Sequence, residues 1–200
     1  MAILRDRNNA HCVSDPTHGR IKFFESFFYL KLYEREGLEG GFVCVSRILN
    51  QGLRKLRVGP FDYYTKWIIP VHVLGCHWAL MVVRLETHEI HFYDSLPNLR
   101  VDRATMMAHT LQFVKHAARE ANRLDIADQP WSCEIRESPR QHKDGTDCGL
   151  FAMLNAERET LGLTIDGNSY THDDMYDRNV RNLVACEILK YRTQKSFSLK

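Results

Sequence analysis

The sequence contains no long hydrophobic run and no large surplus of one charge. Its apolar stretches all stay below the about 18 residues that cross a membrane, and the N-terminal Met-Ala-Ile-Leu-Arg-Asp lacks the apolar core of a signal peptide. The formal net charge of +2 over 200 residues is too small to indicate a nucleic-acid or membrane partner. We therefore expect an intracellular protein, in the nucleus or cytoplasm, that binds neither nucleic acid nor membranes.

The six cysteines do not have the spacing of a disulfide framework or a thiolate zinc site, because no C-x-x-C pair occurs. The sequence also lacks H-E-x-x-H, and the closest histidine pair, His88 and His91, would point to opposite faces of a strand. We therefore expect neither a metal nor an organic cofactor. Five cysteines are predicted to be small buried hydrophobic side chains, namely Cys12, Cys44, Cys76, Cys133 and Cys186.

Neither internal repeats nor a low-complexity linker divides the chain, so we predict one domain over residues 1–200. Residues 1–20 are polar and are expected to be irregular. Residues 21–36 are rich in aromatic side chains at helical spacing. Gly37, Gly40 and Gly41 are expected to break the chain after them.

Three runs predict neighbouring strands over residues 67–74, 78–85 and 88–94, the last because Ile90 and Phe92 alternate with His91 and Tyr93. The middle run is almost continuously apolar, which is typical of a central strand covered on both faces. Alternation of Trp131, Cys133 and Ile135 with polar residues predicts a fourth strand.

Helices are predicted over residues 102–123, 149–159 and 171–189, the last with an N-terminal cap at residues 171–174. The predicted buried stripe of the first helix consists of Met107, Leu111, Val114, Ala118 and Ala121. A block of strands between helices indicates an α+β fold.

Cys148 differs from the other cysteines because a polar loop, residues 141–147, delivers it to the start of an apolar helix. The partial positive charge of a helix N-terminus stabilises a thiolate, which is the nucleophilic form of cysteine. Backbone N–H groups there have no helical partner and can donate to a developing oxyanion. Gly149 leaves space for a substrate backbone. Cys148 is therefore a candidate nucleophile, with Gly149 as a substrate-binding position.

A nucleophilic thiol needs a base and a group that orients the base. His77 begins one predicted strand and Asp94 ends the next, so hairpin pairing would let Asp94 accept the imidazole N–H. Gln141, just before the nucleophile, suits an oxyanion donor. The residues alone leave the structural alternatives open, because a histidine in a strand is usually structural and an aspartate before Ser-Leu-Pro usually forms a turn.

Three segments resemble the ubiquitin-like-protein-specific proteases, the SUMO (sentrin-specific) protease family, which shares its core with the adenoviral protease. The segments are IPVH with HWALMVV (residues 69–72 and 77–83), FYDSL (92–96) and PRQ with DGTDCGLF (139–141 and 144–151). The order His, Asp, Gln, Cys also fits this family, whereas papain has its cysteine first. Residues 171–189 resemble the family's closing helix, so the resemblance covers residues 66–190.

This resemblance implies Cys148 as the nucleophile and His77 as its base. It implies Asp94 as the residue that orients the base and Gln141 as the oxyanion donor. Trp78 would line a narrow channel for a Gly-Gly tail, where a flat indole excludes larger side chains. The implied fold is a papain-like, adenain-like core with a central mixed sheet flanked by helices and the nucleophile at a helix N-terminus.

Two features depart from the family. Residues 20–25 lack its W-L-N-D motif, whose tryptophan forms the other side of the channel. Gln141 lies one residue further from Cys148 than in SUMO-specific members, a spacing closer to the viral relative.

The activity that the resemblance implies is that of a monomeric cysteine protease that cleaves after the C-terminal Gly-Gly of a ubiquitin-like modifier, with SUMO expected. It would act as a deconjugating isopeptidase, a precursor-processing peptidase or both, with the modifier and its conjugates as partners. The open alternatives are a protease for ubiquitin or NEDD8, a related acyltransferase, and a non-catalytic module that binds a ubiquitin-like protein.

Overall fold

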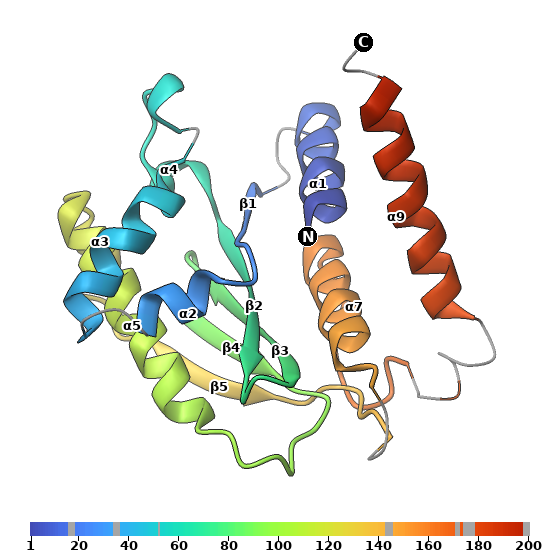
Figure 1. Ribbon diagram of the computed structural model, residues 1–200. Helices are drawn as coiled ribbons and strands as arrows, with labels where there is room; N and C mark the ends of the chain where they lie inside the picture. The colour runs from blue at the N-terminus through green and yellow to red at the C-terminus, as the bar shows by residue number, and fades with distance from the viewer. Residues whose placement is uncertain are drawn as a thin grey trace.

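In the computed structural model, a five-stranded sheet carries helices on both of its faces (Figure 1). The structure describes residues 1–15, 19–33, 37–51, 53–142, 146–170, 173 and 179–197. The strands are β1 (Ile21–Phe23), β2 (Lys66–Val73), β3 (His77–Arg84), β4 (Glu89–Tyr93) and β5 (Ser132–Arg136). The helices are α1 (Ala2–Ser14), α2 (Phe28–Tyr33), α3 (Gly37–Leu49), the 3-10 turn η1 (Leu53–Lys55), α4 (Pro60–Tyr63), α5 (Arg103–Glu120), α6 (Leu124–Ala127), α7 (Cys148–Leu161) and α9 (Val180–Phe197).

The sheet is mixed, with the strand order β1-β2-β3-β4-β5. β2, β3 and β4 form an antiparallel meander, and β1 and β5 join its two edges in parallel. Gly75 allows the tight turn between β2 and β3, because its φ of 68° lies in the left-handed region. The predicted α+β fold with a central mixed sheet is therefore confirmed.

Each face of the sheet has its own hydrophobic core. On one face, β2, β3 and β4 pack against α2, α3 and α5, where Trp67, Met81 and Phe92 are fully buried. On the other face, Leu80 and Val82 of β3 pack in a second core that includes residues of α7. Figure 1 shows α1 and α7 on the opposite side of the sheet from α2, α3 and α5. The prediction that the middle apolar run is covered on both faces is confirmed.

The prediction that residues 1–20 are irregular is wrong, because Ala2–Ser14 forms helix α1. Its two buried residues, Asn8 and Cys12, do not make an apolar stripe. Asn8 Oδ1 instead accepts the backbone N–H of Ile21 at 3.1 Å and fixes the helix to β1. Polar contacts of this kind leave no hydrophobic periodicity to detect.

The prediction that glycines break the chain near residue 40 is also wrong, because Gly37, Gly40 and Gly41 belong to α3. A Cβ atom at Gly41 would lie 2.1 Å from the carbonyl oxygen of Leu32 in α2. Glycine is therefore needed here for the close approach of two helices.

Helix α5 confirms the predicted helix and three residues of its predicted stripe, because Met107, Val114 and Ala118 are buried. Leu111 is only half-buried and Ala121 is exposed, whereas Met106, Phe113 and Ala117 are buried. The ring of Phe113 lies 6.1 Å from that of Trp67, measured between centroids. The contact with the sheet thus decides which stripe of the helix is covered.

The prediction of five buried cysteines is wrong for Cys76, Cys133 and Cys186, which are exposed. They lie in the β2–β3 turn, on β5 and on α9, respectively. Cys12 is buried as predicted, and the side chain of Cys44 lies outside the described part of the chain.

The last predicted helix corresponds to α9, and its predicted cap lies, apart from Asp173, outside the described residues. No helix in the described ranges combines the length and the apolar character needed to span a bilayer.

Candidate active site

His77 and Asp94 meet at one end of the sheet. His77 is the first residue of β3, and Asp94 follows the last residue of β4. The imidazole Nε2 donates to Asp94 Oδ1 at 2.8 Å, and both side chains are almost fully buried. Because Leu80 pairs with Tyr93, the contact is diagonal across the ladder rather than between directly opposed residues. The structure thus brings together the two residues that the hairpin prediction placed side by side.

The Asp94 carboxylate has several donors. Its Oδ1 also accepts the backbone N–H of Leu96 at 2.8 Å, and its Oδ2 accepts Arg103 Nε at 2.9 Å and Nη2 at 2.5 Å. Burial raises the pKa of Asp94, but the hydrogen bonds from His77, Leu96 and Arg103 outweigh it and hold the pKa below its ordinary value. Asp94 is therefore ionised at neutral pH.

An ionised Asp94 fixes the tautomer of His77. A carboxylate only accepts, so Nε2 carries the proton and Nδ1 keeps a lone pair. A histidine held in this form can take a proton at Nδ1 and becomes a cation next to a fixed anion. This is the environment that a general base requires.

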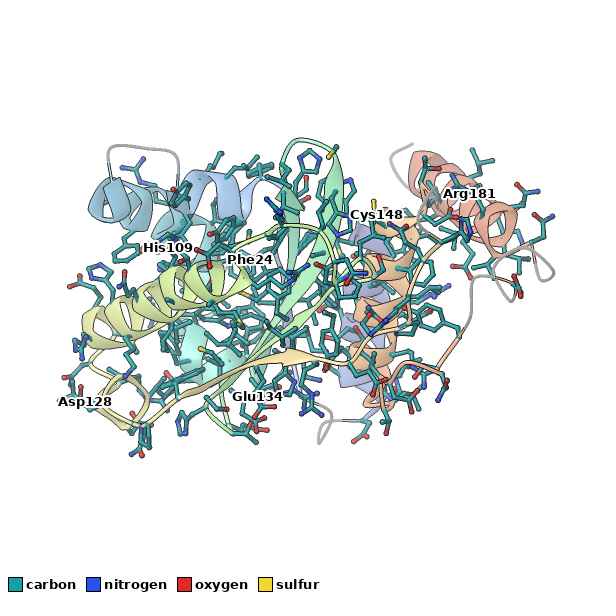
Figure 2. The ribbon with its side chains drawn as sticks, turned by 90° about the horizontal axis from the view of Figure 1, so that it is seen from below. Phe24, His109, Asp128, Glu134, Cys148 and Arg181 are labelled. Carbon is teal, nitrogen blue, oxygen red and sulfur yellow. The ribbon has the colours of Figure 1, made fainter. Side chains whose placement is uncertain are left out.

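Cys148 is the first residue of α7, as the sequence predicts. The first backbone hydrogen bond of the helix runs from Phe151 N to Asp147 O, so the N–H groups before it have no partner within the helix. In Figure 2, α7 lies between the central sheet and α9, and Cys148 lies at one end of α7. Arg181 projects from α9. Arg181 forms an ion pair with Asp147, the residue before Cys148. The thiol therefore lies at the positive end of a helix that further contacts hold in place.

The far end of α7 is fixed to the sheet through Glu159, which is 2% exposed. Its carboxylate accepts from Lys66 Nζ at 2.9 Å, from Arg84 Nη2 at 2.7 Å and from the Tyr93 hydroxyl at 2.6 Å. Burial raises the pKa of Glu159, but the neighbouring Lys66 and the donated hydrogen bonds lower it below its ordinary value. One buried anion thus joins α7 to β2, β3 and β4.

Cys148 and His77 line the same cavity, which has a volume of about 790 Å³. The lining comes from β2, the β2–β3 turn and β3, from the segments after β4 and before α7, from the first half of α7, from the start of α9 and from residues near the N-terminus. Besides Cys148 and His77 it includes Met1, Ala2, Glu25, Ser26, Cys76, Trp78, Leu96, Leu99, Gln141, Gly149, Arg181 and Val184.

The other predicted site residues also reach this cavity. A Cβ atom at Gly149 would lie 3.5 Å from Cδ1 of Trp78, so the indole lies against the backbone next to Cys148. The backbone N–H of Gln141 donates to Ser95 O at 3.1 Å. Its side-chain amide is buried, and both polar atoms lack a hydrogen-bond partner among the described residues. Such an amide is costly unless a ligand satisfies it, which favours a binding role.

Two residues of the site escape the sequence argument. Arg103 stands in the first turn of a helix, where a cation is unfavourable, and this mismatch could have marked it. Glu159 interrupts the otherwise apolar or neutral buried face of α7, which is formed by Phe151, Ala152, Asn155 and Ala156. A charge on a buried stripe indicates a fixed partner, although it does not say which.

A thiol at a helix N-terminus and a histidine oriented by a carboxylate, on one cavity, define the class of thiol-dependent hydrolases and acyl transferases. Within this class the chain belongs to the Ulp1 protease family, because residues 1–192 match that family's C-terminal catalytic domain. The resemblance expected from three short motifs is thereby confirmed over almost the whole chain.

Several known proteins are similar to the chain. It is 30% identical over 173 residues to ubiquitin-like-specific protease ESD4 of Arabidopsis thaliana, covering 86% of this chain and 32% of the relative. It is 27% identical over 159 residues to a sentrin-specific protease of Caenorhabditis elegans, covering 78% and 20%. The catalytic domain of the Ulp1-like SUMO protease of Chaetomium thermophilum superposes with a TM-score of 0.62 at 25% identity, covering 85% of this chain and 61% of that one. The chain thus spans less than half the length of these two curated relatives.

Proposed function

We propose that this chain is the catalytic domain of a cysteine protease that cleaves after the C-terminal Gly-Gly of a ubiquitin-like modifier, with SUMO as the modifier. The observation that carries the proposal is the ionised Asp94 bound to His77 on the cavity that Cys148 lines. Both hydrophobic cores share one sheet, which supports a single domain over residues 1–200. The oligomeric state that we propose is a monomer.

In the proposed reaction His77 Nδ1 takes the thiol proton, and the thiolate of Cys148 attacks the carbonyl carbon of the last glycine. Gln141 and the free N–H groups at the start of α7 donate to the resulting oxyanion. The imidazolium of His77 then gives its proton to the leaving amine, which is a substrate lysine or the first residue of a precursor tail. Water, activated by the same histidine, hydrolyses the thioester and restores the thiol.

The contact between Trp78 and Gly149 supports glycine specificity. The indole also stacks on His72, with ring centroids 4.3 Å apart, and this contact limits its movement. A substrate backbone that runs along Trp78 and the start of α7 has little space for side chains next to the scissile bond. A Gly-Gly tail meets this restriction because it has no Cβ atoms.

The choice of SUMO is supported by the relatives, since the similar Chaetomium thermophilum domain is described as a SUMO protease. The nucleus or cytoplasm is the proposed compartment. Exposed cysteines outside disulfides, such as Cys76 and Cys133, are typical of proteins in reducing compartments.

The test is a panel of SUMO, ubiquitin and NEDD8 whose C-terminal glycine carries a thiol-reactive electrophile. We expect the SUMO probe to label the wild type, and Cys148→Ala and His77→Ala to remain unlabelled while folded. Cys76→Ala is the matched control, because Cys76 is an exposed thiol on the same cavity, and it should label like the wild type.

Each other outcome separates one alternative. Preferential labelling by ubiquitin or NEDD8 would assign a different modifier. Binding of a modifier without labelling would make the chain a recognition module, and transfer of an acetyl group would make it an acyltransferase. Turnover of the SUMO substrate by Cys148→Ala would contradict the assignment of the nucleophile.

A further inference from the structure

Arg103 occupies a position that its own helix does not favour. It is the first residue of α5, whose N-terminal cap is Asp102, with Oδ1 accepting Thr105 N at 3.0 Å. The partial positive charge of a helix N-terminus repels a cation, and burial of an arginine requires fixed acceptors. The Arg103 side chain is nevertheless only 11% exposed. The stability of α5 therefore does not explain why an arginine is buried at this position.

The reason lies in what the guanidinium contacts. Arg103 turns back over the segment between β4 and α5 and donates twice to Asp94 Oδ2. The same group donates to three backbone carbonyl oxygens of that segment, those of Leu96 at 3.1 Å, Leu99 at 3.2 Å and Val101 at 3.4 Å. One side chain thus joins the carboxylate of the site to a segment whose Leu96 and Leu99 line the cavity.

The two oxygens of Asp94 divide these tasks. Oδ2 is taken up by Arg103, and Oδ1 is left for His77 and for the backbone N–H of Leu96. Because the guanidinium fork is planar and donates to one oxygen from two nitrogens, it fixes the rotation of the carboxylate about its Cβ–Cγ bond. That rotation decides whether Oδ1 points at His77 Nε2.

We propose that Arg103 is a positioning residue of this active site, which holds the Asp94 carboxylate ionised and turned toward His77 while it fixes the wall formed by Leu96 and Leu99. The proposal rests on the function proposed above for Cys148 and His77. Arg103 does not touch the substrate and acts through Asp94.

Loss of Arg103 has a consequence that depends on pH. Without the fork, Asp94 Oδ2 remains buried but loses both donors, so the pKa of Asp94 rises. A protonated Asp94 no longer supports the imidazolium of His77, and the reactive thiolate of Cys148 is then lost at a higher pH. The acid limb of the activity profile therefore moves to higher pH when Arg103 is removed.

The experiment compares Arg103→Gln, Arg103→Lys and Arg103→Ala with the wild type. Two readouts are measured across pH 4 to 9: kcat and KM on a SUMO Gly-Gly amide substrate, and the alkylation rate of Cys148 by iodoacetamide, resolved by peptide mass spectrometry. We expect kcat of Arg103→Gln to fall about tenfold or more and its acid limb to move up by about one pH unit. The kcat and the acid limb of Arg103→Lys should lie between those of the wild type and those of Arg103→Gln, because lysine keeps the charge but lacks the planar fork.

Arg100→Gln is the matched control, since Arg100 is an exposed arginine on the same segment, and it should behave like the wild type. If Arg103→Gln does not fold, the same measurements on Arg103→Lys and on Arg103→Ala still test the proposal. Arg103→Ala is assayed with millimolar guanidinium, which can occupy the space that the side chain leaves. Recovery of kcat by guanidinium supports the proposal.

A folded Arg103 variant with wild-type kcat and an unmoved acid limb overturns the proposal. So does a loss that is equal at every pH and merely follows the unfolded fraction. The failure of the proposed function is distinguishable, because a wild type without turnover of any Gly-Gly substrate would contradict that function alone. The pH dependence of Cys148 alkylation would still test Arg103.

Discussion

At the scale of single residues, the hydrogen-bond donors around Asp94 matter as much as its charge. Among the described residues, the hydrogen bonds to this carboxylate all come from donors: His77 and Leu96 donate to Oδ1, and Arg103 donates to Oδ2. A side chain with an N–H group in place of either Asp94 oxygen would face the N–H group of a neighbouring donor. The site is therefore built for a carboxylate and not for its isosteric amide.

Asp94→Asn tests this directly. With its amide nitrogen toward Arg103, the asparagine loses a charge-assisted contact and opposes two N–H groups. With the nitrogen toward His77, it donates to Nε2 and moves the ring proton to Nδ1, where it blocks acceptance of the thiol proton. We expect kcat on a Gly-Gly substrate to fall by about 10² or more, with the fold retained.

Steady-state kinetics and circular dichroism check the Asp94→Asn prediction. Asp102→Asn is a suitable control, because Asp102 is an exposed cap that asparagine can replace. Activity of Asp94→Asn within about twofold of the wild type would show that the carboxylate does not set the tautomer of His77.

The sequence predicts part of this residue-level arrangement. His77 and Asp94 could be paired because each stands at the end of an apolar strand, and hairpin geometry brings such ends together. Arg103 could not be found in the same way. Its contact with Asp94 depends on the path of residues 95–102, which have no regular secondary structure and hence no periodicity to interpret.

At the scale of elements, α7 carries the proposed nucleophile Cys148 at one end and the buried anion Glu159 at the other. Glu159 binds Lys66 of β2, Arg84 of β3 and Tyr93 of β4. These bonds fix the helix axis against β2, β3 and β4. His77 is the first residue of β3, and Asp94 follows β4. The position of Cys148 relative to His77 thus depends on packing of the whole helix and not on the first turn alone.

Glu159→Gln should therefore destabilise the protein while leaving the chemistry intact. The substitution leaves Lys66 and the partly buried Arg84 without their counter-ion, at a cost of about 3 kcal/mol in the free energy of unfolding. Urea unfolding at pH 7 measures this change. The kcat of the folded variant should remain within about twofold of wild type, because no reacting group is altered.

Glu157→Gln is the matched control on the same helix. Glu157 forms an exposed ion pair with Arg7 at 3.1 Å, so its loss should cost less than about 0.5 kcal/mol. Equal effects of the two substitutions would contradict the special role of Glu159 in anchoring α7.

Elements that are stabilised by burial of apolar residues could be predicted from the sequence, whereas elements that depend on particular tertiary contacts could not. β2, β3 and β4 lie within a residue or two of their predicted bounds. Burial on both faces requires nearly continuous apolar runs in β2 and β3, and β4 is recognisable because Ile90 and Phe92 alternate with His91 and Tyr93. α1 and α3 were missed for different reasons. α1 buries polar Asn8, and α3 uses Gly41 to approach Leu32, so in both cases a tertiary contact overrides the local signal.

At the scale of the whole molecule, the central strands are protected and one edge is open. All five residues of β5 are exposed, and Figure 2 shows Glu134 pointing outward from this strand. Glu134 and Arg136 form an ion pair at 2.9 Å along it. Charged side chains on an edge strand oppose pairing with another chain, which agrees with the expected monomer.

The stability of the whole molecule should depend on pH in part through three buried groups, which are Asp94, Glu159 and His91. Asp94 and Glu159 both have a pKa below the ordinary carboxyl value, for the reasons given above. Burial also lowers the pKa of His91, and the nearby Arg84 adds to this effect. In all three cases the unfolded chain binds a proton more readily than the folded one.

This common sign predicts an asymmetric acid response. As pH falls, the unfolded chain protonates His91 first, from its ordinary pKa of 6.5, and then the carboxylates, near 4.5 and 3.8. The contribution of these three groups to the free energy of unfolding should thus be fully present above about pH 7, decline gently below about 6.5 and fall steeply below about 4.5. Urea unfolding between pH 3.5 and 8 measures this curve. In Glu159→Gln the fall in stability below about pH 4.5 should become shallower, because one of the two buried carboxylates no longer titrates. A wild-type stability that increased toward pH 4 would contradict the assigned charges.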